Sequence, residues 1–110
     1  MKQGELWMVD LNPTKGSEQA GQRPVVIVSG NLANTYLNVV ICCPLSSKIK
    51  NYKGNVVLAA TAENGLSAAS EILTFHIRSI AKERLSKKLG TITTKELALI
   101  KSCFDDIWRY

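Results

Sequence analysis

Histidine, cysteine and acidic residues are all scarce in this sequence of 110 residues, and the shortage of the first two argues against a metal site. There is one histidine, His76, and there are three cysteines. Cys42 and Cys43 are neighbours, so in a strand their side chains point to opposite faces and suit neither a mutual disulfide nor a shared metal ion. We therefore expect no metal, no cofactor, and reduced, mostly buried thiols of the kind found in a reducing compartment.

The sequence also lacks any apolar run that approaches the roughly 18 residues of a membrane span. Residues 1–5 lead directly into strand-like sequence, without the apolar segment of a signal peptide. These absences predict a cytoplasmic protein with no membrane contact. Linkers and repeats are missing too, so residues 1–110 are expected to form one domain. Its core is small enough that pairing with a second copy is expected.

Acidic residues number nine against fourteen lysines and arginines, which gives a net charge of +5. The isoelectric point is about 9.3. A surplus of this sign favours a polyanion or an acidic protein as partner.

Short apolar segments separated by Gly, Asn, Pro and Ser predict a mainly-β fold, either a small barrel or a sandwich. In the first segment Trp7, Val9 and Leu11 share one face, and the second is apolar enough to be buried on both faces. The predicted strands are 6–11, 24–28, 37–45, 55–59 and 72–75, with 77–80 either extending the fifth or adding a sixth.

The end of the chain changes to a helical period. Thr93 and Glu96 have the spacing of a capping box, in which each side chain accepts a hydrogen bond from the backbone N–H of the other residue. One apolar stripe follows at steps of three and four residues, which predicts a helix of about four turns packed on the barrel. The stripe consists of Leu97, Ile100, Cys103, Phe104, Ile107 and Trp108.

Residues 15–23 form a polar loop in front of an apolar strand. Gly16 and Gly21 allow tight turns in which backbone N–H groups can face an anion. Arg23 precedes a proline and is therefore biased towards an extended conformation, and its planar, permanently charged guanidinium suits a phosphate group. The alternative is a solvated hairpin with a surface arginine.

A second polar cluster follows the third predicted strand. Ser46 and Ser47 can donate hydrogen bonds to a phosphate oxygen. Three lysines then surround one tyrosine, which supplies charge for a nucleic-acid backbone and a ring for a base. These residues are Lys48, Lys50, Tyr52 and Lys53. The alternative is an ordinary lysine-rich surface hairpin.

His76 follows the predicted strand 72–75. If that strand continues with Phe75 pointing inward, His76 and Arg78 point outward on one face, towards a common cleft. A lone histidine is also commonly a structural residue. Three carboxylates, Glu71, Asp105 and Asp106, are expected to be surface charges.

The residues from Gly4 to Pro24 closely resemble the N-terminal signature of the MazF/PemK toxin endoribonucleases. The shared pattern includes Trp7, Val9–Asp10 and the ordered run from Leu11 to Pro24. The likeness continues through Pro44–Ser47, Val56–Leu58, Ile77–Ile80 and the terminal helix from Glu96, so it covers nearly the whole chain.

This resemblance implies an SH3-like β-barrel of five to seven strands with a C-terminal helix, usually a homodimer. It implies metal-independent, sequence-specific cleavage of single-stranded RNA to 2′,3′-cyclic phosphate and 5′-OH ends. It also implies inhibition by an antitoxin with an acidic, partly disordered tail, and indirect DNA binding through that antitoxin.

The same resemblance gives roles to single residues. Arg23 matches the catalytic arginine, Ser46 the catalytic hydroxyl, and Glu18 the acid of the polar loop. Many relatives carry Asp-Gln where this chain has Phe75-His76, so either Glu18 or His76 is expected to be the general base. The predicted RNA-binding residues are Lys15, Gln19, Ser47, Lys48, Lys50, Tyr52, Lys53 and Arg78.

Two other functions fit parts of the sequence. One is a toxin that grips DNA gyrase with the same barrel; such toxins share a Trp-Gly-Ile tail, whereas this chain ends in Ile107-Trp108-Arg109-Tyr110. The other is a catalytically inactive barrel that only binds RNA or an antitoxin. The substitution at Phe75 favours that alternative, and the presence of both Arg23 and Ser46 opposes it.

Overall fold

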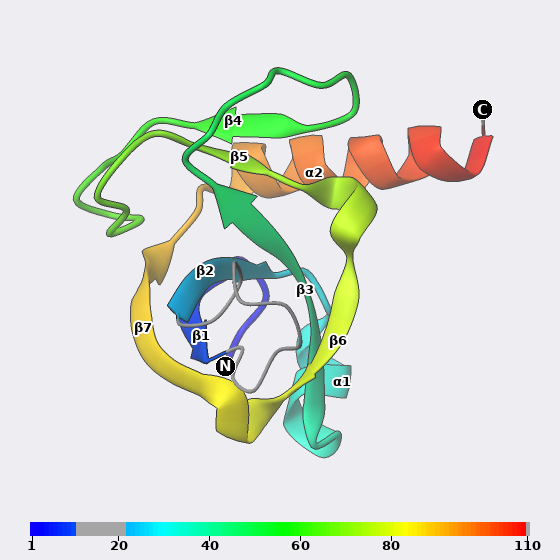
Figure 1. Ribbon diagram of the computed structural model, residues 1–110. Helices are drawn as coiled ribbons and strands as arrows, with labels where there is room; N and C mark the ends of the chain where they lie inside the picture. The colour runs from blue at the N-terminus through cyan, green and yellow to red at the C-terminus, as the bar shows by residue number, and fades with distance from the viewer. Residues whose placement is uncertain (11–21, 110) are drawn as a thin grey trace, which may run out of the picture.

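The computed structural model describes residues 1–10 and 22–109. Within these two ranges, seven strands, one short helix and two 3₁₀ turns precede a long terminal helix (Figure 1). In chain order the elements are β1 (Glu5–Asp10), β2 (Gln22–Ile27), α1 (Asn31–Tyr36), β3 (Val39–Ser46), β4 (Val56–Leu58), β5 (Ser70–Ile72), η2 (Thr74–His76), β6 (Arg78–Ala81), η3 (Lys82–Arg84), β7 (Leu85–Thr91) and α2 (Thr94–Arg109).

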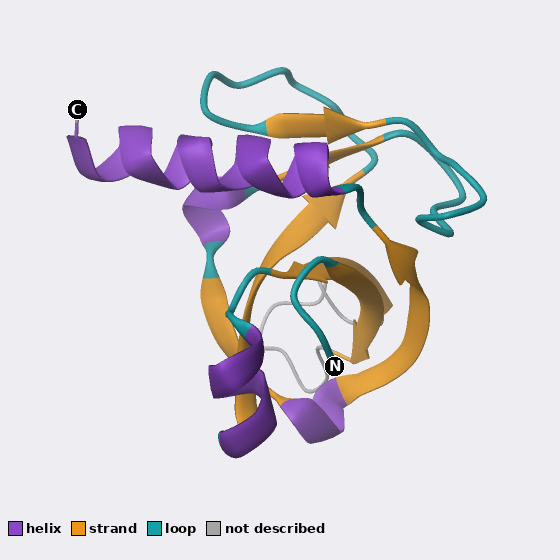
Figure 2. Ribbon diagram, turned by 180° about the vertical axis from the view of Figure 1, so that it is seen from behind, coloured by secondary structure: helices purple, strands orange, loops and turns teal. Residues whose placement is uncertain are grey.

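The strands form one antiparallel sheet in the order β4-β5-β3-β2-β1-β7, and β6 pairs with β3 beside this path. The sheet curls around a core without closing, and α2 lies across β4 and β5 at one end (Figures 1 and 2). The predicted mainly-β, SH3-like fold with a C-terminal helix is therefore confirmed. No helix among the described residues is long and apolar enough to cross a membrane.

Strand β3 is the wall shared by two hydrophobic clusters. Cys42 and Cys43 are both fully buried, and they pack into different clusters because adjacent side chains of a strand point to opposite faces. Cys43 joins the cluster under α2 that includes Ile100, whereas Cys42 joins the cluster inside the curled sheet that includes Val9. The predicted burial of these two thiols is confirmed, and neither forms a disulfide.

Most predicted strands are present within one or two residues. Residues 25–27 of β2 are buried in succession, as expected for a strand covered on both faces, and Trp7 packs with Val9 as predicted. Leu11 lies outside the described residues. Helix α1 and strand β7 were not predicted. In β7 the charged pair Lys87-Lys88 interrupts the apolar pattern, although β7 pairs with β1 along its length.

The prediction of a strand over 72–75 is wrong. Strand β5 ends at Ile72, and residues 74–76 form the 3₁₀ turn η2 before β6 begins. Thr74 is fully buried at the start of this turn, and its hydroxyl lies 2.7 Å from the Gly54 carbonyl oxygen. This contact holds the chain in a turn where the residue types alone favour a strand.

The capping box of α2 is confirmed. The Thr93 N–H donates to Glu96 Oε1 at 2.8 Å, and the Glu96 N–H donates to Thr93 Oγ1 at 3.0 Å. Ile100 is fully buried, and Leu97 and Phe104 pack beside it. The expected stripe is wrong at its end, because Trp108 is 79% exposed on the part of α2 that extends past the sheet (Figure 1).

Two glycines allow the turn before Leu66 to lie directly against β7. A Cβ atom on Gly65 would overlap the Leu89 carbonyl, and one on Gly90 would overlap the backbone of Glu63 and Asn64. The Thr91 N–H donates to the Glu63 carbonyl at 2.9 Å across the same contact. Backbone therefore meets backbone here, with no room for a side chain on either segment.

Candidate functional site

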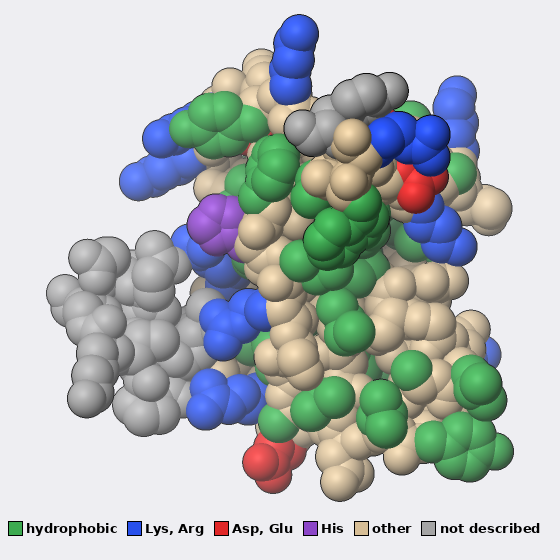
Figure 3. Space-filling view, turned by 90° about the vertical axis from the view of Figure 1, so that its right-hand side faces the viewer, with side chains coloured by type: hydrophobic (Ala, Val, Ile, Leu, Met, Phe, Trp, Pro, Cys, Tyr) green, Lys and Arg blue, Asp and Glu red, His purple; other side chains and the backbone are tan. Residues whose placement is uncertain are grey.

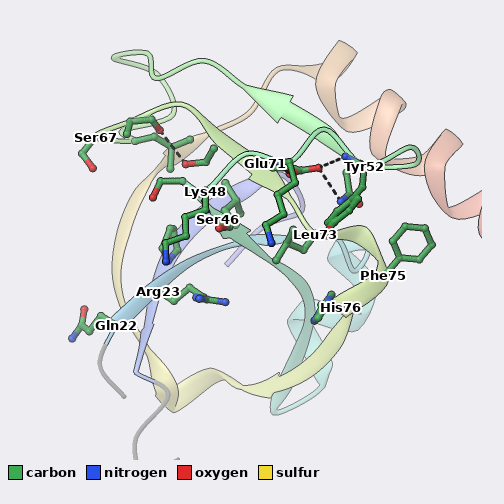
Figure 4. Close-up of a pocket in the computed structure, with 18 residues that line it drawn as sticks. Gln22, Arg23, Ser46, Lys48, Tyr52, Ser67, Glu71, Leu73, Phe75 and His76 are labelled. Carbon is green, nitrogen blue, oxygen red and sulfur yellow. Dashed lines mark hydrogen bonds between the residues drawn. The ribbon is translucent and has the colours of Figure 1, made fainter. Parts of the chain in front are cut away.

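A cleft of about 830 Å³ opens over the adjoining ends of β2, β3 and β5 (Figure 4). Residues from the β3–β4 loop form one wall, and η2 forms another. Seven residues predicted from the sequence to act on RNA line this cleft: Arg23, Ser46, Ser47, Lys48, Lys50, Tyr52 and His76.

Arg23 and Ser46 are brought together by strand register. Strand β2 pairs with β3 through Val25 and Pro44, and continuing this register by two residues brings Arg23 opposite Ser46. Residues directly opposite in an antiparallel pair project from the same face of the sheet. Arg23 is half-buried and lines the cleft.

The Ser46 hydroxyl also interacts with the loop that follows it. Its oxygen accepts a hydrogen bond from the Lys48 N–H at 3.1 Å. That bond uses a lone pair and leaves the hydroxyl proton able to donate to another acceptor. Beside the Arg23 guanidinium, such a donor suits an oxyanion.

The lysine-rich loop divides its side chains between two hollows. Lys48, Lys50 and Tyr52 line the cleft and are exposed. Lys53 instead lines a separate hollow of about 530 Å³ between this loop and α2, which it shares with Phe75. Charge and an aromatic ring therefore meet at the cleft, as the sequence predicted, but Lys53 is not part of it.

Glu71 corrects the expectation of a surface charge, because it is fully buried beneath the cleft. Its carboxylate accepts hydrogen bonds from the Lys50 N–H at 2.8 Å, the Tyr52 N–H at 3.0 Å and Asn55 Nδ2 at 3.1 Å. The bond from the Lys50 amide lowers the pKa of Glu71 most, and burial opposes it. Asp105 and Asp106 are exposed, as predicted.

The strand-alternation argument for His76 is wrong because His76 belongs to η2. Phe75 does not point inward: its side chain is 59% exposed. His76 is exposed and lines the cleft nevertheless, and Arg78 lies outside it on β6, opposite Cys42 on β3. Figure 3 shows the histidine at one edge of the molecule, with lysine and arginine side chains above and below it.

Three predicted residues, Lys15, Glu18 and Gln19, lie outside the described residues. Among the cleft residues that the sequence did not indicate are Asn55 and four residues of the segment 66–70, namely Leu66, Ser67, Ala68 and Ser70. Asn55 is held by Glu71 and Thr74, whereas the segment 66–70 lines the far rim. A run of small residues, Ser67-Ala68-Ala69-Ser70, was the available signal for that rim.

The cysteines do not contribute to this chemistry. Burial raises the pKa of Cys42 and of Cys43 to about 12, so both stay protonated at neutral pH. Among residues 1–10 and 22–109 no three His, Cys, Asp or Glu side chains form a group that could hold a metal ion.

Comparison with known proteins identifies the family of this chain. Residues 2–107 match the family described as PemK-like, MazF-like toxin of type II toxin-antitoxin system. The chain is 38% identical over 117 residues to Endoribonuclease MazF9 of Mycobacterium tuberculosis, covering 98% of each chain. It is 39% identical over 100 residues to Endoribonuclease toxin MazF of Escherichia coli K12, covering 90% of this chain and 86% of the relative.

Solved structures share the fold. MazF from Deinococcus radiodurans superposes with a TM-score of 0.79 at 26% identity, over 100% of this chain and 97% of the other. A MazE–MazF complex from the same organism gives 0.79 at 23% identity, over 99% and 95% of the two chains. With a match along 2–107 and relatives this similar over nearly all of their length, the chain belongs to the PemK-like, MazF-like toxins of type II toxin–antitoxin systems.

Proposed function

We propose that this chain is a toxin endoribonuclease that cleaves single-stranded RNA by using the RNA's own 2′-OH as nucleophile. The observation that carries the proposal is that Arg23 and Ser46, from the neighbouring strands β2 and β3, line one cleft together with Lys48 and Lys50. The relatives at 38% and 39% identity, which bear the name endoribonuclease, support the same reaction class.

In this reaction the 2′-oxygen forms a bond to the adjacent phosphorus, and the bond from phosphorus to the 5′-oxygen breaks. The products are a 2′,3′-cyclic phosphate and a 5′-OH end. Arg23 stabilises the negative charge that grows on the phosphorane, and Ser46 donates a hydrogen bond to a non-bridging oxygen. The substrate supplies the nucleophile, so this mechanism requires no metal ion.

A general base takes the 2′-OH proton, and the departing 5′-oxygen gains a proton from a general acid or from water. Two residues can act as the base. His76 lines the cleft and is exposed, and Glu18 matches the acid of the family's polar loop. Glu71 is not suited to the role, because its carboxylate accepts hydrogen bonds from Lys50, Tyr52 and Asn55 and is fully buried.

RNA binding is proposed for the lysine-rich wall of the cleft. Lys48 and Lys50 neutralise backbone phosphates, Tyr52, which is 55% exposed, stacks on a base, and Ser47 donates to a phosphate oxygen. Lys53 and Arg78, which do not line the cleft, are proposed to extend this surface. Lys15 and Gln19 are also proposed to bind RNA.

The deciding experiment uses an RNA in which the single ribose 5′ to the cleaved bond is replaced by deoxyribose. Cleavage of that RNA should stop because the nucleophile is gone, while the all-ribose RNA should be cleaved equally well with and without EDTA. Cleavage of the deoxyribose-substituted RNA, or loss of activity in EDTA, contradicts the mechanism. Binding without cleavage of the all-ribose RNA indicates an inactive RNA-binding barrel. If the protein neither binds nor cleaves that RNA, the result indicates a gyrase-type protein-binding toxin.

Partners and location are proposed from the family and from the charge of the chain. An antitoxin with an acidic, partly disordered segment would bind the basic cleft and block RNA. A MazE–MazF complex is among the similar structures, in support of such a partner. We further propose a cytoplasmic homodimer of single-domain chains, 1–110, with indirect DNA binding through the antitoxin.

A further inference from the structure

A chain of buried polar groups connects two walls of the cleft from below. Glu71 and Thr74 are both fully buried, and Asn55 lies between them. Asn55 donates through Nδ2 to Glu71 at 3.1 Å and accepts through Oδ1 from the Thr74 N–H at 3.1 Å. The three side chains come from β5, from the end of the β3–β4 loop and from η2, so one network joins three segments.

At one end of the network, the β3–β4 loop folds around the Glu71 carboxylate. The N–H groups of Lys50 and Tyr52 both point at its oxygens, at 2.8 and 3.0 Å. Asn51 between them has φ of +55°, a left-handed conformation that asparagine tolerates better than most residues. A left-handed residue within a turn can direct the backbone N–H groups on either side of it towards one anion. Figure 4 shows the resulting hydrogen bonds between Glu71 and the loop.

At the other end, the network fixes the turn that carries His76. Thr74 is the first residue of η2, and its hydroxyl lies 2.7 Å from the Gly54 carbonyl oxygen and 2.8 Å from Asn55 Oδ1. The turn with His76 is thus bonded to Asn55, the loop with the lysines is bonded to Glu71, and the hydrogen bond between Asn55 and Glu71 connects the two.

This arrangement is costly to break. A fully buried carboxylate is tolerated only when hydrogen bonds compensate for its lost hydration, and here the donors come from residues of the cleft wall. Removing the charge therefore releases the backbone of the loop that presents the lysines. By contrast, Glu5 accepts hydrogen bonds from Lys2, Trp7 and Lys88, none of which lines the cleft.

We propose that Glu71 is a positioning residue for RNA binding: through the Lys50 and Tyr52 amides it sets the conformation in which Lys48, Lys50 and Tyr52 face the substrate. The inference rests on the proposed ribonuclease function. Glu71 itself contacts no RNA in this account. It acts through the loop, and the hydrogen bond between Asn55 and Thr74 fixes the position of the loop relative to η2.

The test is a double-mutant cycle between Glu71→Gln and a variant with Lys48→Gln and Lys50→Gln. RNA affinity is measured against salt concentration on a non-cleavable RNA that carries deoxyribose at the cleaved position. Each phosphate contact on a single strand contributes about 0.7 to the log–log salt slope, so the two-lysine variant should lose about 1.4. Glu71→Gln alone should lose about 0.7 or more and bind about tenfold more weakly, the cost of releasing one or both lysines.

The expected result is non-additivity: in the two-lysine background, Glu71→Gln should leave the salt slope unchanged. Its effect on affinity should be smaller there than in wild type, because only the Tyr52 contact remains to be lost. Glu5→Gln is the matched control, since it removes a buried carboxylate outside the cleft and should leave the salt slope unchanged. An unchanged slope in Glu71→Gln, or equal effects in both backgrounds, overturns the inference.

If Glu71→Gln does not fold, Thr74→Val breaks the network at its other end without changing charge, and the same cycle applies to it. Amide hydrogen exchange at Lys50 and Tyr52 adds a readout independent of RNA, and both amides should lose protection in Glu71→Gln. Wild-type protein that neither binds nor cleaves RNA contradicts the proposed function. Normal wild-type binding with additive variants contradicts only the positioning role.

Discussion

Two buried glutamates hold two different regions of this molecule, the seam between β1 and β7 and the base of the cleft. Glu5, which is 7% exposed, accepts hydrogen bonds at 3.0 Å from the Lys2 N–H and from Trp7 Nε1, and it pairs with Lys88 at 3.2 Å. Glu71, which is fully buried, is held by donors that carry no charge, two loop amides and Asn55.

Both glutamates are buried, so burial does not distinguish their roles. The location of their hydrogen-bond donors does. The partners of Glu5 lie on β1, on β7 and just before β1, so this carboxylate joins the ends of strands that the sheet already pairs. The partners of Glu71 lie in an irregular loop that no strand pairing fixes. One acid supports the sheet, whereas the other shapes a surface.

The largest expected effect is on the cleavage rate, and it distinguishes residues of the cleft from residues that join β1 to β7. Arg23→Ala should lower the cleavage rate by about 10²–10³-fold or more, because it removes a preorganised positive donor, while thermal unfolding stays close to wild type. Lys88→Ala should do the reverse: it removes the partner of Glu5, costs about 1 kcal/mol or less, and leaves the rate unchanged. Single-turnover cleavage and thermal melts check both. An Arg23→Ala variant within a few-fold of wild type would move the active site elsewhere.

A smaller effect is expected from removing the general base that acts in the cleft. Loss of the base should cost about 10²-fold and remove the acidic limb of the pH–rate profile. We expect this of Glu18→Gln, whose position matches the family's loop, with His76→Gln close to wild type. The measurement is the single-turnover rate of both variants across pH. The opposite pattern transfers the role to His76, and two near-normal variants mean that positioning by Arg23 and Ser46 suffices.

The smallest expected effect is on the pH dependence of the free energy of unfolding, to which both Glu5 and Glu71 contribute. For Glu71, the Lys50 amide lowers the pKa most; for Glu5, burial raises it, but the bonds from Trp7, Lys2 and Lys88 together outweigh burial. Both folded-state pKa values lie below the ordinary value of 4.5, so each acid stabilises the fold above that pH. The contribution is lost as pH falls through the lowered pKa.

Chemical denaturation of wild type, Glu5→Gln and Glu71→Gln between pH 7 and pH 3 measures these contributions. At pH 7 each variant should be less stable than wild type by about 1–3 kcal/mol. The gap should narrow below pH 4.5 as the wild-type carboxylates take up protons. A gap that stays constant with pH would mean that the charge of that acid does not contribute.

The sequence predicted those parts of the fold that depend on local pattern. The continuous apolar run at β2 and the capping box of α2 were both recognised, since each is complete within a few residues. Strand β7 was missed because its lysines hide the alternation, and η2 was missed because the Thr74–Gly54 contact that holds the turn joins residues 20 apart.

The candidate site divides in the same way. The motif alone indicated Arg23 and Ser46, and the pairing of β2 with β3 then explained why both line one cleft. Glu71 could not have been found, because its role depends on a loop 19–21 residues earlier that folds back over it. A carboxylate next to Ser70 reads as a surface residue until that contact is known.

The contact between Gly65 and Gly90 limits how this sequence can vary. The atoms in the way of a side chain at Gly65 belong to the backbone of Leu89, and those at Gly90 belong to the backbone of Glu63 and Asn64. No compensating substitution nearby can shrink a main chain, so neither position can be rescued by a second change. The exposed lysines and tyrosine of the cleft meet no such barrier to substitution, whereas both glycines must be retained for the two main chains to lie this close.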